Sequence, residues 1–404
     1  MKRICAGILV FLTCFSANAL NTSYRLSLRT GGILPDGKIE KFAPNRTLPI
    51  GAEFAVTFHP QWTALNDWNR AGIGTALSYW YLGDNQLLGH IIAPYVFLDI
   101  PLVKLPHFRL GIRPGIGIGF VTKTYQNTIP PDRLYLELGH ANQSIGSVTN
   151  FHFPEALFLE FPLRNGWSIL ASAGWYHFSN GSTIQPNSGY NIVSGEIGVH
   201  YNPLYNNSPT HVWDKTNDHR TKQWELAFAF TGGARQVYYK DQQTFFASTI
   251  QAAAYWRAHN IFRLGGGCDI FYDGAYTQRK TLFIKTNLDV AQPADCWRMG
   301  FSVQPEFVFG DFTAGFHFGV YLYDPIKELE PMQDAQAQPN GRIKKGIFYP
   351  YDILKAGSAG YPDGWLYTQI VLRYHLPFHL FIQANMKAHL TKVEFVGIGL
   401  GTWF

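Results

Sequence analysis

An alternation of apolar with small or polar residues, at a period of two, recurs along the chain and limits what it can fold into. It is clearest between Phe312 and Tyr323, where every second side chain is apolar. Successive side chains of a β-strand point to opposite faces, so this pattern predicts strands with one apolar face. Similar stretches occur at 224–230, 299–303, 366–372 and 380–388. We therefore expect an all-β fold.

The composition favours a membrane barrel over a soluble sheet. Aromatic residues make up 16% of the chain, charged residues only 15%, and there are 39 glycines. A soluble domain carries about a quarter charged residues. No run of about eighteen apolar residues follows the N-terminal segment, so no transmembrane helix is expected. A transmembrane antiparallel β-barrel needs an apolar residue only at every second position of its lipid face, and the sequence fits that requirement.

The C-terminus indicates which membrane. Its last stretch alternates Val396, Ile398, Leu400, Thr402 and Phe404 with Phe395, three glycines and Trp403. A final strand that ends on an aromatic residue resembles the signal read by the outer-membrane assembly machinery. We therefore expect the bacterial outer membrane as the location and the barrel-assembly machinery as a partner during biogenesis.

The strand-like stretches number about eight in residues 22–203 and about eight in 222–404, and 203–221 resembles a linker. Two architectures remain open: one barrel of about sixteen strands, or an eight-stranded barrel followed by a second β half. The connections alternate between short and long, as they do in such barrels. Tight turns are expected at 164–166, 257–260, 310–311 and 376–379. Long external loops are expected at 34–49, 120–150, 273–296 and 324–362. The segment 59–71 is longer than a periplasmic turn and the pattern does not explain it.

The first nineteen residues have the anatomy of a secretory signal peptide. Lys2 and Arg3 precede a short apolar run, which ends at the small-residue site Ala17-Asn18-Ala19. We expect residues 1–19 to be removed, so that the mature chain starts near Leu20 and comprises the halves 20–203 and 222–404. The formal net charge of +5 includes the two basic residues of this segment, so it gives no support for nucleic-acid binding.

Two of the four cysteines, Cys268 and Cys296, lie outside the predicted signal peptide. They could form one disulfide in the oxidising cell envelope. Nothing in their spacing suggests a metal site, and no metal is expected.

One hairpin carries a pattern of reactive residues. His177, Ser179 and Asn180 are followed, after a short loop, by Pro186-Asn187 and Gly189. This segment resembles the active site of the outer-membrane lipid A 3-O-deacylases, also called acyloxyacyl hydrolases. Their pattern is His-x-Ser-Asn, a short loop, Pro-Asn-x-Gly and an acidic residue two places later, where this chain has Asn191.

The resemblance implies a fold, an activity and a substrate. It covers residues 20–203 and implies an eight-stranded barrel there, whereas 222–404 lie outside it. The implied activity is hydrolysis of an ester-linked acyl chain of lipid A or lipopolysaccharide by a carboxylic ester hydrolase with a Ser/His mechanism. No cofactor is implied.

The alternation predicts which way these side chains point. Before the loop, the lipid-facing set is Trp167, Ile169, Ala171, Ala173 and Trp175. His177 and Ser179 continue this parity. After the loop, Asn191 and Val193 face the lipid, whereas Glu196 faces the lumen. His177, Ser179 and Asn191 should therefore share one outer face. Because 164–166 is the periplasmic turn, they lie at the external rim, at the depth of the acyl esters of an outer-leaflet glycolipid.

These residue types suit ester hydrolysis. A serine hydroxyl needs a neighbouring base to become a nucleophile, and a histidine supplies one near neutral pH. A third group must orient the imidazole. We expect Ser179 as nucleophile, His177 as base and Asn191 as the orienting residue. Asn180 and Asn187 are expected to donate hydrogen bonds to the developing oxyanion.

A second histidine motif lies close to the C-terminal end of the sequence. His389-Leu390-Thr391 imitates the His-x-Ser pattern, but its parity turns His389 inward, beside Lys387. The rival function is a non-catalytic outer-membrane barrel that acts as a channel or a lipid-binding protein. A wide, charged lumen would favour that rival, and a lipid-side pocket beside His177 would favour the hydrolase.

Overall fold

A computed structural model describes most of both halves of the chain. The described residues are 22–34, 39, 43–60, 62, 65, 67–129, 141–203, 211–212, 223–236, 243–278, 293–324, 366–389 and 392–404. The predicted signal peptide, 1–19, and the predicted mature start near Leu20 lie outside them. No helix in this part of the chain is long and apolar enough to cross a membrane.

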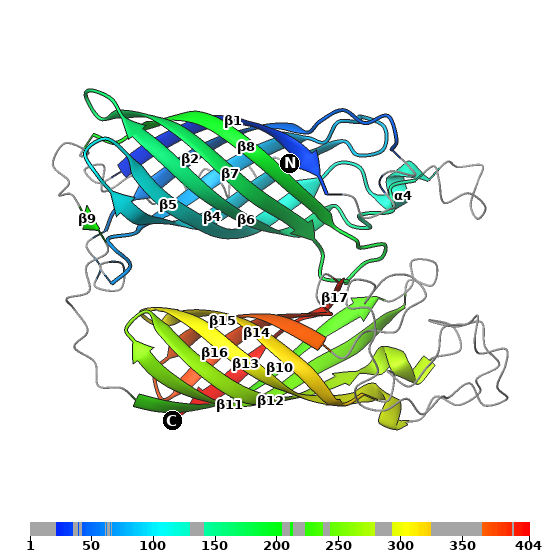
Figure 1. The fold of residues 1–404 in the computed structure, drawn as a ribbon. Helices are drawn as coiled ribbons and strands as arrows, with labels where there is room; N and C mark the ends of the chain where they lie inside the picture. Colours follow the sequence, from blue (N-terminus) through cyan, green and yellow to red (C-terminus); the bar gives the residue numbers. More distant parts are fainter. Residues whose placement is uncertain are drawn as a thin grey trace. The chain divides into compact units, whose positions relative to one another are not determined.

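The first half forms a closed antiparallel barrel of eight strands (Figure 1). Its strands are β1 (Thr22–Ile33), β2 (Ile50–Phe58), β3 (Gly72–Tyr81), β4 (His90–Lys104), β5 (Arg109–Val121), β6 (Thr149–Pro162), β7 (Trp167–Ser179) and β8 (Tyr190–Tyr201). Strands that follow one another in the chain are neighbours, and β1 pairs with β8 to close the ring. A short helix, α4 (Tyr125–Thr128), follows β5, and the two-residue strand β9 (His211–Val212) pairs with the end of β4.

The second half forms another closed antiparallel barrel of eight strands (Figure 1). Its strands are β10 (Gln223–Gln236), β11 (Thr244–His259), β12 (Phe262–Asp273), β13 (Trp297–Phe309), β14 (Phe312–Tyr323), β15 (Leu366–Leu376), β16 (Leu380–His389) and β17 (Lys392–Trp403). Two short 3₁₀ helices, η4 (Gly274–Gln278) and η5 (Pro293–Cys296), lie between β12 and β13. The ring closes where β17 pairs with β10. The all-β prediction is thus confirmed, and of the two open architectures the single sixteen-stranded barrel is wrong.

The alternation in the sequence corresponds to the outer and inner faces of each barrel: successive side chains of a strand are exposed and buried in turn. In β7, Ile169 is 46% exposed, whereas its neighbour Leu170 is fully buried. The same alternation runs through β8, where Val193 and Ile197 are exposed and Glu196 is buried. In lipid every backbone group needs a partner within the protein, and a closed antiparallel ring supplies one to each strand.

The short connections at 164–166, 310–311 and 376–379 lie where they were predicted, whereas β11 continues to His259 and its turn to β12 lies at 260–261. Between β6 and β7, the Leu163 N–H donates to the Trp167 carbonyl over 2.7 Å. Gly166 adopts φ +78° in this turn, a left-handed conformation that glycine takes without steric cost. The unexplained segment between β2 and β3 is packed: Trp68 is buried, and the Asn69 side chain donates to the Pro101 carbonyl over 2.7 Å.

Charged side chains fill the lumen of the first barrel. Arg29 contacts Glu53 at 2.5 Å and Glu196 at 3.1 Å, and Arg109 contacts Glu160 at 3.2 Å. Each of these side chains is buried. Buried charges are tolerated when they are paired and hydrogen-bonded. The lumen is therefore charged but occupied by its own ion pairs.

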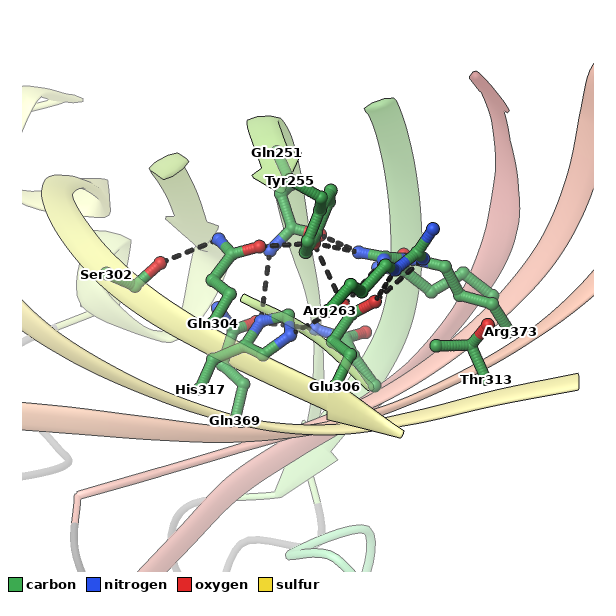
Figure 2. A network of polar contacts seen from close by, with 12 residues as sticks. Gln251, Tyr255, Arg263, Ser302, Gln304, Glu306, Thr313, His317, Gln369 and Arg373 are labelled. Atoms are coloured by element: carbon green, nitrogen blue, oxygen red, sulfur yellow. Dashed lines mark hydrogen bonds and ion pairs between the residues drawn. The ribbon is translucent and has the colours of Figure 1, made fainter. Parts of the chain in front are cut away.

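The lumen of the second barrel holds a comparable network, centred on Glu306 (Figure 2). This carboxylate accepts hydrogen bonds from Arg263 at 2.8 Å, Arg373 at 2.6 Å, His317 at 2.9 Å and Tyr255 at 2.9 Å. The four partners come from four different strands, β12, β15, β14 and β11. Their side chains therefore cross the lumen.

His389 points inward as predicted, fully buried and 2.9 Å from Glu394. The two cysteines that could have formed a disulfide, Cys268 and Cys296, are both free. Cys268 lies in β12 opposite Phe301, whereas Cys296 precedes β13 by one residue. A separation of five residues is roughly 15 Å along a strand, and a disulfide needs Cα atoms within about 7 Å.

Candidate active site

His177 and Asn191 are direct neighbours across the β7–β8 ladder. The Nδ1 atom of His177 lies 2.8 Å from Oδ1 of Asn191. An amide oxygen accepts hydrogen bonds and does not donate them, so Nδ1 must carry the proton. The other ring nitrogen, Nε2, then holds a free lone pair in the neutral ring. The bond therefore fixes the tautomer in which His177 can accept a proton through Nε2.

Aromatic rings flank the His177 ring on the outer face of the barrel. The Trp175 ring lies 5.5 Å away and the Phe153 ring 6.2 Å away, both nearly parallel to it. On the lumen side, the buried His152 ring donates to the His177 carbonyl over 3.3 Å and stacks on Phe178 at 4.2 Å. Both the ring and the backbone of His177 are thus held in place.

Ser179 is the last residue of β7, two positions beyond His177 and on the same face. Its Oγ accepts hydrogen bonds from Nδ2 of Asn187 at 3.0 Å and from the Gly181 N–H at 3.3 Å. Residues two apart in a strand are separated by roughly 7 Å. Among the contacts of the described residues there is no hydrogen bond from Ser179 to the His177 ring.

The two asparagines of the loop differ in their arrangement. The Asn180 side chain donates to Ser147 Oγ at 2.8 Å and to the Ile184 carbonyl at 2.7 Å, so both of its amide protons are engaged. The Asn180 backbone N–H instead donates to Oδ1 of Asn187 at 3.1 Å. That bond directs Nδ2 of Asn187 toward Ser179. An amide N–H of Asn187 is therefore directed at Ser179 Oγ, whereas both amide protons of Asn180 are engaged elsewhere.

The structure brings all five predicted residues together on one hairpin, and it adds two groups that the sequence reasoning missed. The Gly181 N–H is a backbone donor, which no side-chain pattern reveals. Ser147 comes from a loop that precedes β6, 33 residues from its partner Asn180, and no local pattern connects them. Gly181 follows directly on the His-x-Ser-Asn motif, and its φ of +66° marks a sharp turn there.

Glu196, the carboxylate of this hairpin, does not lie with His177, Ser179 and Asn191. Glu196 points into the lumen, as its parity predicted, where Arg29 holds it at 3.1 Å. Tyr176 donates to the same carboxylate over 3.4 Å.

Across the described ranges, no group of three His, Cys, Asp or Glu side chains is arranged to hold a metal ion.

Comparison with protein families matches both halves of the chain. Residues 50–200 match the family described as lipid A 3-O-deacylase (PagL), and residues 224–333 match the acyloxyacyl hydrolase C-terminal domain. The chain belongs to the lipid A 3-O-deacylase family. It is an ester hydrolase of the bacterial outer membrane, whose reaction removes an ester-linked acyl chain from lipid A. The resemblance drawn from the hairpin motif is confirmed. The second barrel lay outside that resemblance, and its residues 224–333 match the C-terminal domain of the acyloxyacyl hydrolases.

Comparison with solved structures finds porins. A mutant and a triple mutant of the Rhodopseudomonas blastica porin each cover 95% of this chain, and 99% of their own length is matched. The sequence identity is 7% for both, and the TM-scores are 0.16 and 0.17. Values this low support no argument about the fold or function of the deacylase. No curated protein matches the chain.

Proposed function

We propose that this deacylase cleaves its ester with Ser179 as nucleophile, His177 as general base and Asn191 as the residue that orients the imidazole. The observation that carries the proposal is the 2.8 Å bond from His177 Nδ1 to Asn191 Oδ1. It leaves Nε2 of His177 as a hydrogen-bond acceptor, on the outer face that His177 shares with Ser179. A base must present a lone pair to the hydroxyl that it activates, and this tautomer does so.

The reaction follows from these positions. Ser179 Oγ attacks the ester carbonyl carbon while its proton passes to His177 Nε2. The tetrahedral intermediate collapses as the protonated ring gives this proton to the leaving sugar oxygen, and the acyl chain stays on Ser179 as an ester. A water molecule then attacks that ester, with His177 accepting the proton of the water and returning it to Oγ. The products are a free fatty acid and a deacylated glycolipid.

Asn187 and Gly181 are suited to stabilise the oxyanion. Asn187 Nδ2 and the Gly181 N–H both donate toward Ser179 Oγ in the absence of substrate. When Oγ bonds to the ester carbon, the carbonyl oxygen can take over these donors as it acquires negative charge. Asn180, whose side chain is engaged elsewhere, acts by holding Asn187 and not as a donor to the oxyanion.

The substrate reaches the site from the lipid phase. His177, Ser179 and Asn191 continue the outer parity of β7 and β8, and the acyl chains of lipopolysaccharide lie against that face. A channel is not favoured, because the described lumen of each barrel contains buried ion pairs that join different strands. We also propose that residues 1–19 direct export and that the barrel-assembly machinery recognises β17 together with Phe404, the aromatic residue that follows it.

The test is a lipid A deacylation assay on the full chain in detergent, with fatty acid release followed by mass spectrometry. We expect Ser179→Ala and His177→Ala to abolish release, while heat-modifiable electrophoretic mobility shows that the barrels still fold. Ser194→Ala, a lumen-facing serine of β8, is the matched control and should retain activity. If purified wild-type protein released no fatty acid from any lipid A preparation, the proposal would fall.

A further inference from the structure

The loop between β7 and β8 carries Ser179 and the two proposed oxyanion donors, Asn187 and the Gly181 N–H. This loop, Ser179–Ser188, forms one compact unit with Gln143–Ser147 and with the second barrel. Within that unit it contacts the ends of two neighbouring strands, β10 and β17. The loop that surrounds the nucleophile is therefore held in part by residues far along the chain.

Gln236 makes most of these contacts. It is the last residue of β10, buried and paired with Thr244 of β11. Its side-chain Oε1 accepts the N–H of Gln185 at 2.9 Å, and its backbone carbonyl accepts Nε2 of Gln185 at 3.2 Å. Its backbone N–H donates to the Ser182 carbonyl over 2.8 Å. Gln236 thus binds the loop at two residues through three hydrogen bonds.

Gln185 connects Gln236 to Asn187. The Asn187 N–H donates to Oε1 of Gln185 over 3.0 Å, and Asn187 Nδ2 donates to Ser179 Oγ over 3.0 Å. The Gln185 amide has only one orientation that satisfies both neighbours, because its Nε2 must face the Gln236 carbonyl and its Oε1 the Asn187 N–H. A continuous line of hydrogen bonds therefore joins Gln236 to the oxygen of the nucleophile.

Ser182 connects Gln236 to the second donor. It adopts φ +63°, a left-handed conformation that is unfavourable for a residue with a Cβ and persists where the surroundings hold it. Its carbonyl accepts the Gln236 N–H, and its Oγ donates to the Val393 carbonyl at the start of β17. The preceding residue is Gly181, whose N–H donates to Ser179 Oγ over 3.3 Å. The turn that directs this N–H is therefore held by β10 and β17.

We propose that Gln236 is a positioning residue that keeps Asn187 and the Gly181 N–H directed at the oxyanion. This inference rests on the proposed function, because it takes these two groups as the oxyanion donors. Such donors are most effective when they are fixed before the reaction, since they then need no reorganisation in the transition state. A displaced donor lowers the rate of the chemical step without weakening the binding of the lipid. The second barrel therefore affects kcat through the loop and needs no contact with the substrate.

The experiment measures kcat and KM of the full chain on one defined ester in detergent. Gln236→Ala removes the acceptor of the Gln185 N–H. It should lower kcat by about three- to tenfold, the range for one neutral hydrogen bond, with little change in KM. Gln236→Glu keeps an acceptor oxygen at the same reach and should retain most of the wild-type kcat.

Gln383→Ala is the matched control. Gln383 is a buried glutamine of β16, in the second barrel, and accepts a hydrogen bond from Arg373 over 2.7 Å. Among the described contacts it has none with the loop Ser179–Ser188. Its substitution should leave kcat at the wild-type value.

A double variant separates positioning from a general structural role. In Asn187→Ala protein, the further change Gln236→Ala should alter kcat by less than about twofold, because the donor that the Gln236 side chain positions is already gone. The inference is overturned if Gln236→Ala keeps the wild-type kcat, if Gln236→Glu is equally slow, if Gln383→Ala loses as much, or if the two losses multiply. In each of those cases an inactive Ser179→Ala would still support the proposed function. An active Ser179→Ala would overturn the proposed function and this inference with it.

Discussion

Asn191 lies directly across the antiparallel ladder from His177, and its Oδ1 is 2.8 Å from Nδ1 of the imidazole. The motif of the lipid A 3-O-deacylases has an acidic residue at this position. An amide orients the ring as a carboxylate does, since both present an oxygen acceptor. It carries no negative charge, however, and so stabilises the imidazolium of the transition state less.

The first prediction concerns Asn191, which stands where the family motif has an acidic residue. Asn191→Ala should reduce kcat by about one hundredfold or more, because the imidazole loses the partner that fixes its tautomer. Asn191→Asp should retain or raise kcat, since a carboxylate both orients the ring and stabilises its charged form. Initial rates of fatty acid release from lipopolysaccharide measure both effects.

Glu196→Gln is the control for this series. Glu196 lies on the lumen face of the same strand and contacts Arg29, so its charge should matter little to the rate. An inactive Glu196→Gln beside a fully active Asn191→Ala would contradict the assigned faces. A shift of one residue in register sends every side chain of a strand to the opposite face.

The second prediction separates the two loop asparagines. Asn187→Ala removes the donor next to Ser179 Oγ and should lower kcat by about 10²–10³-fold with little change in KM, as loss of an oxyanion donor does. Asn180→Ala should act through a looser Asn187 and lower kcat less. Steady-state kinetics on one defined ester distinguishes the two. Equal losses in both variants would mean that Asn180 contacts the oxyanion itself.

The period-two pattern was sufficient to predict which side chains of β7 and β8 point outward and which point into the lumen. It could not reveal how the strands close, because alternation places a side chain on a face but says nothing about the partner strand. The closing pair of β1 and β8 depends on contacts between residues far apart in the chain, such as Leu28 and Ile197. The same limit hid the bond between Asn180 and Ser147.

The sequence left the pairing of Cys268 and Cys296 open for a related reason. A cysteine count indicates what the redox environment allows, whereas pairing requires a short distance that only the register fixes. The ends of the two halves at residues 203 and 222 also stay predictions, because composition marks a linker only approximately.

The third prediction concerns assembly. Phe404 follows β17, and its backbone exchanges hydrogen bonds with Leu226 of β10 at 2.9 and 3.0 Å. Deletion of Phe404 should sharply lower the amount of folded protein in the outer membrane and leave passage across the inner membrane intact. Fractionation followed by heat-modifiability electrophoresis measures both quantities. Deletion of the first residue of the predicted mature chain, Leu20, is the control and should leave the yield normal.

The last prediction tests whether the second barrel depends on its lumen network. Glu306→Ala would leave Arg263 and Arg373 without their shared carboxylate in a buried setting. Arg263 keeps its ion pair with Glu225, whereas Arg373 loses its carboxylate. Removal of one partner from a buried ion pair costs about 3–5 kcal/mol when the remaining charge is uncompensated. Arg257→Gln is the matched control: it breaks the partly exposed pair of Arg257 with Glu225, at 3.6 Å, and should cost less than about 1 kcal/mol. Urea unfolding of the full chain in detergent, followed by tryptophan fluorescence, gives both free energies. Equal, small losses in the two variants would mean that the charges around Glu306 are hydrated, and that the network does not fill the lumen.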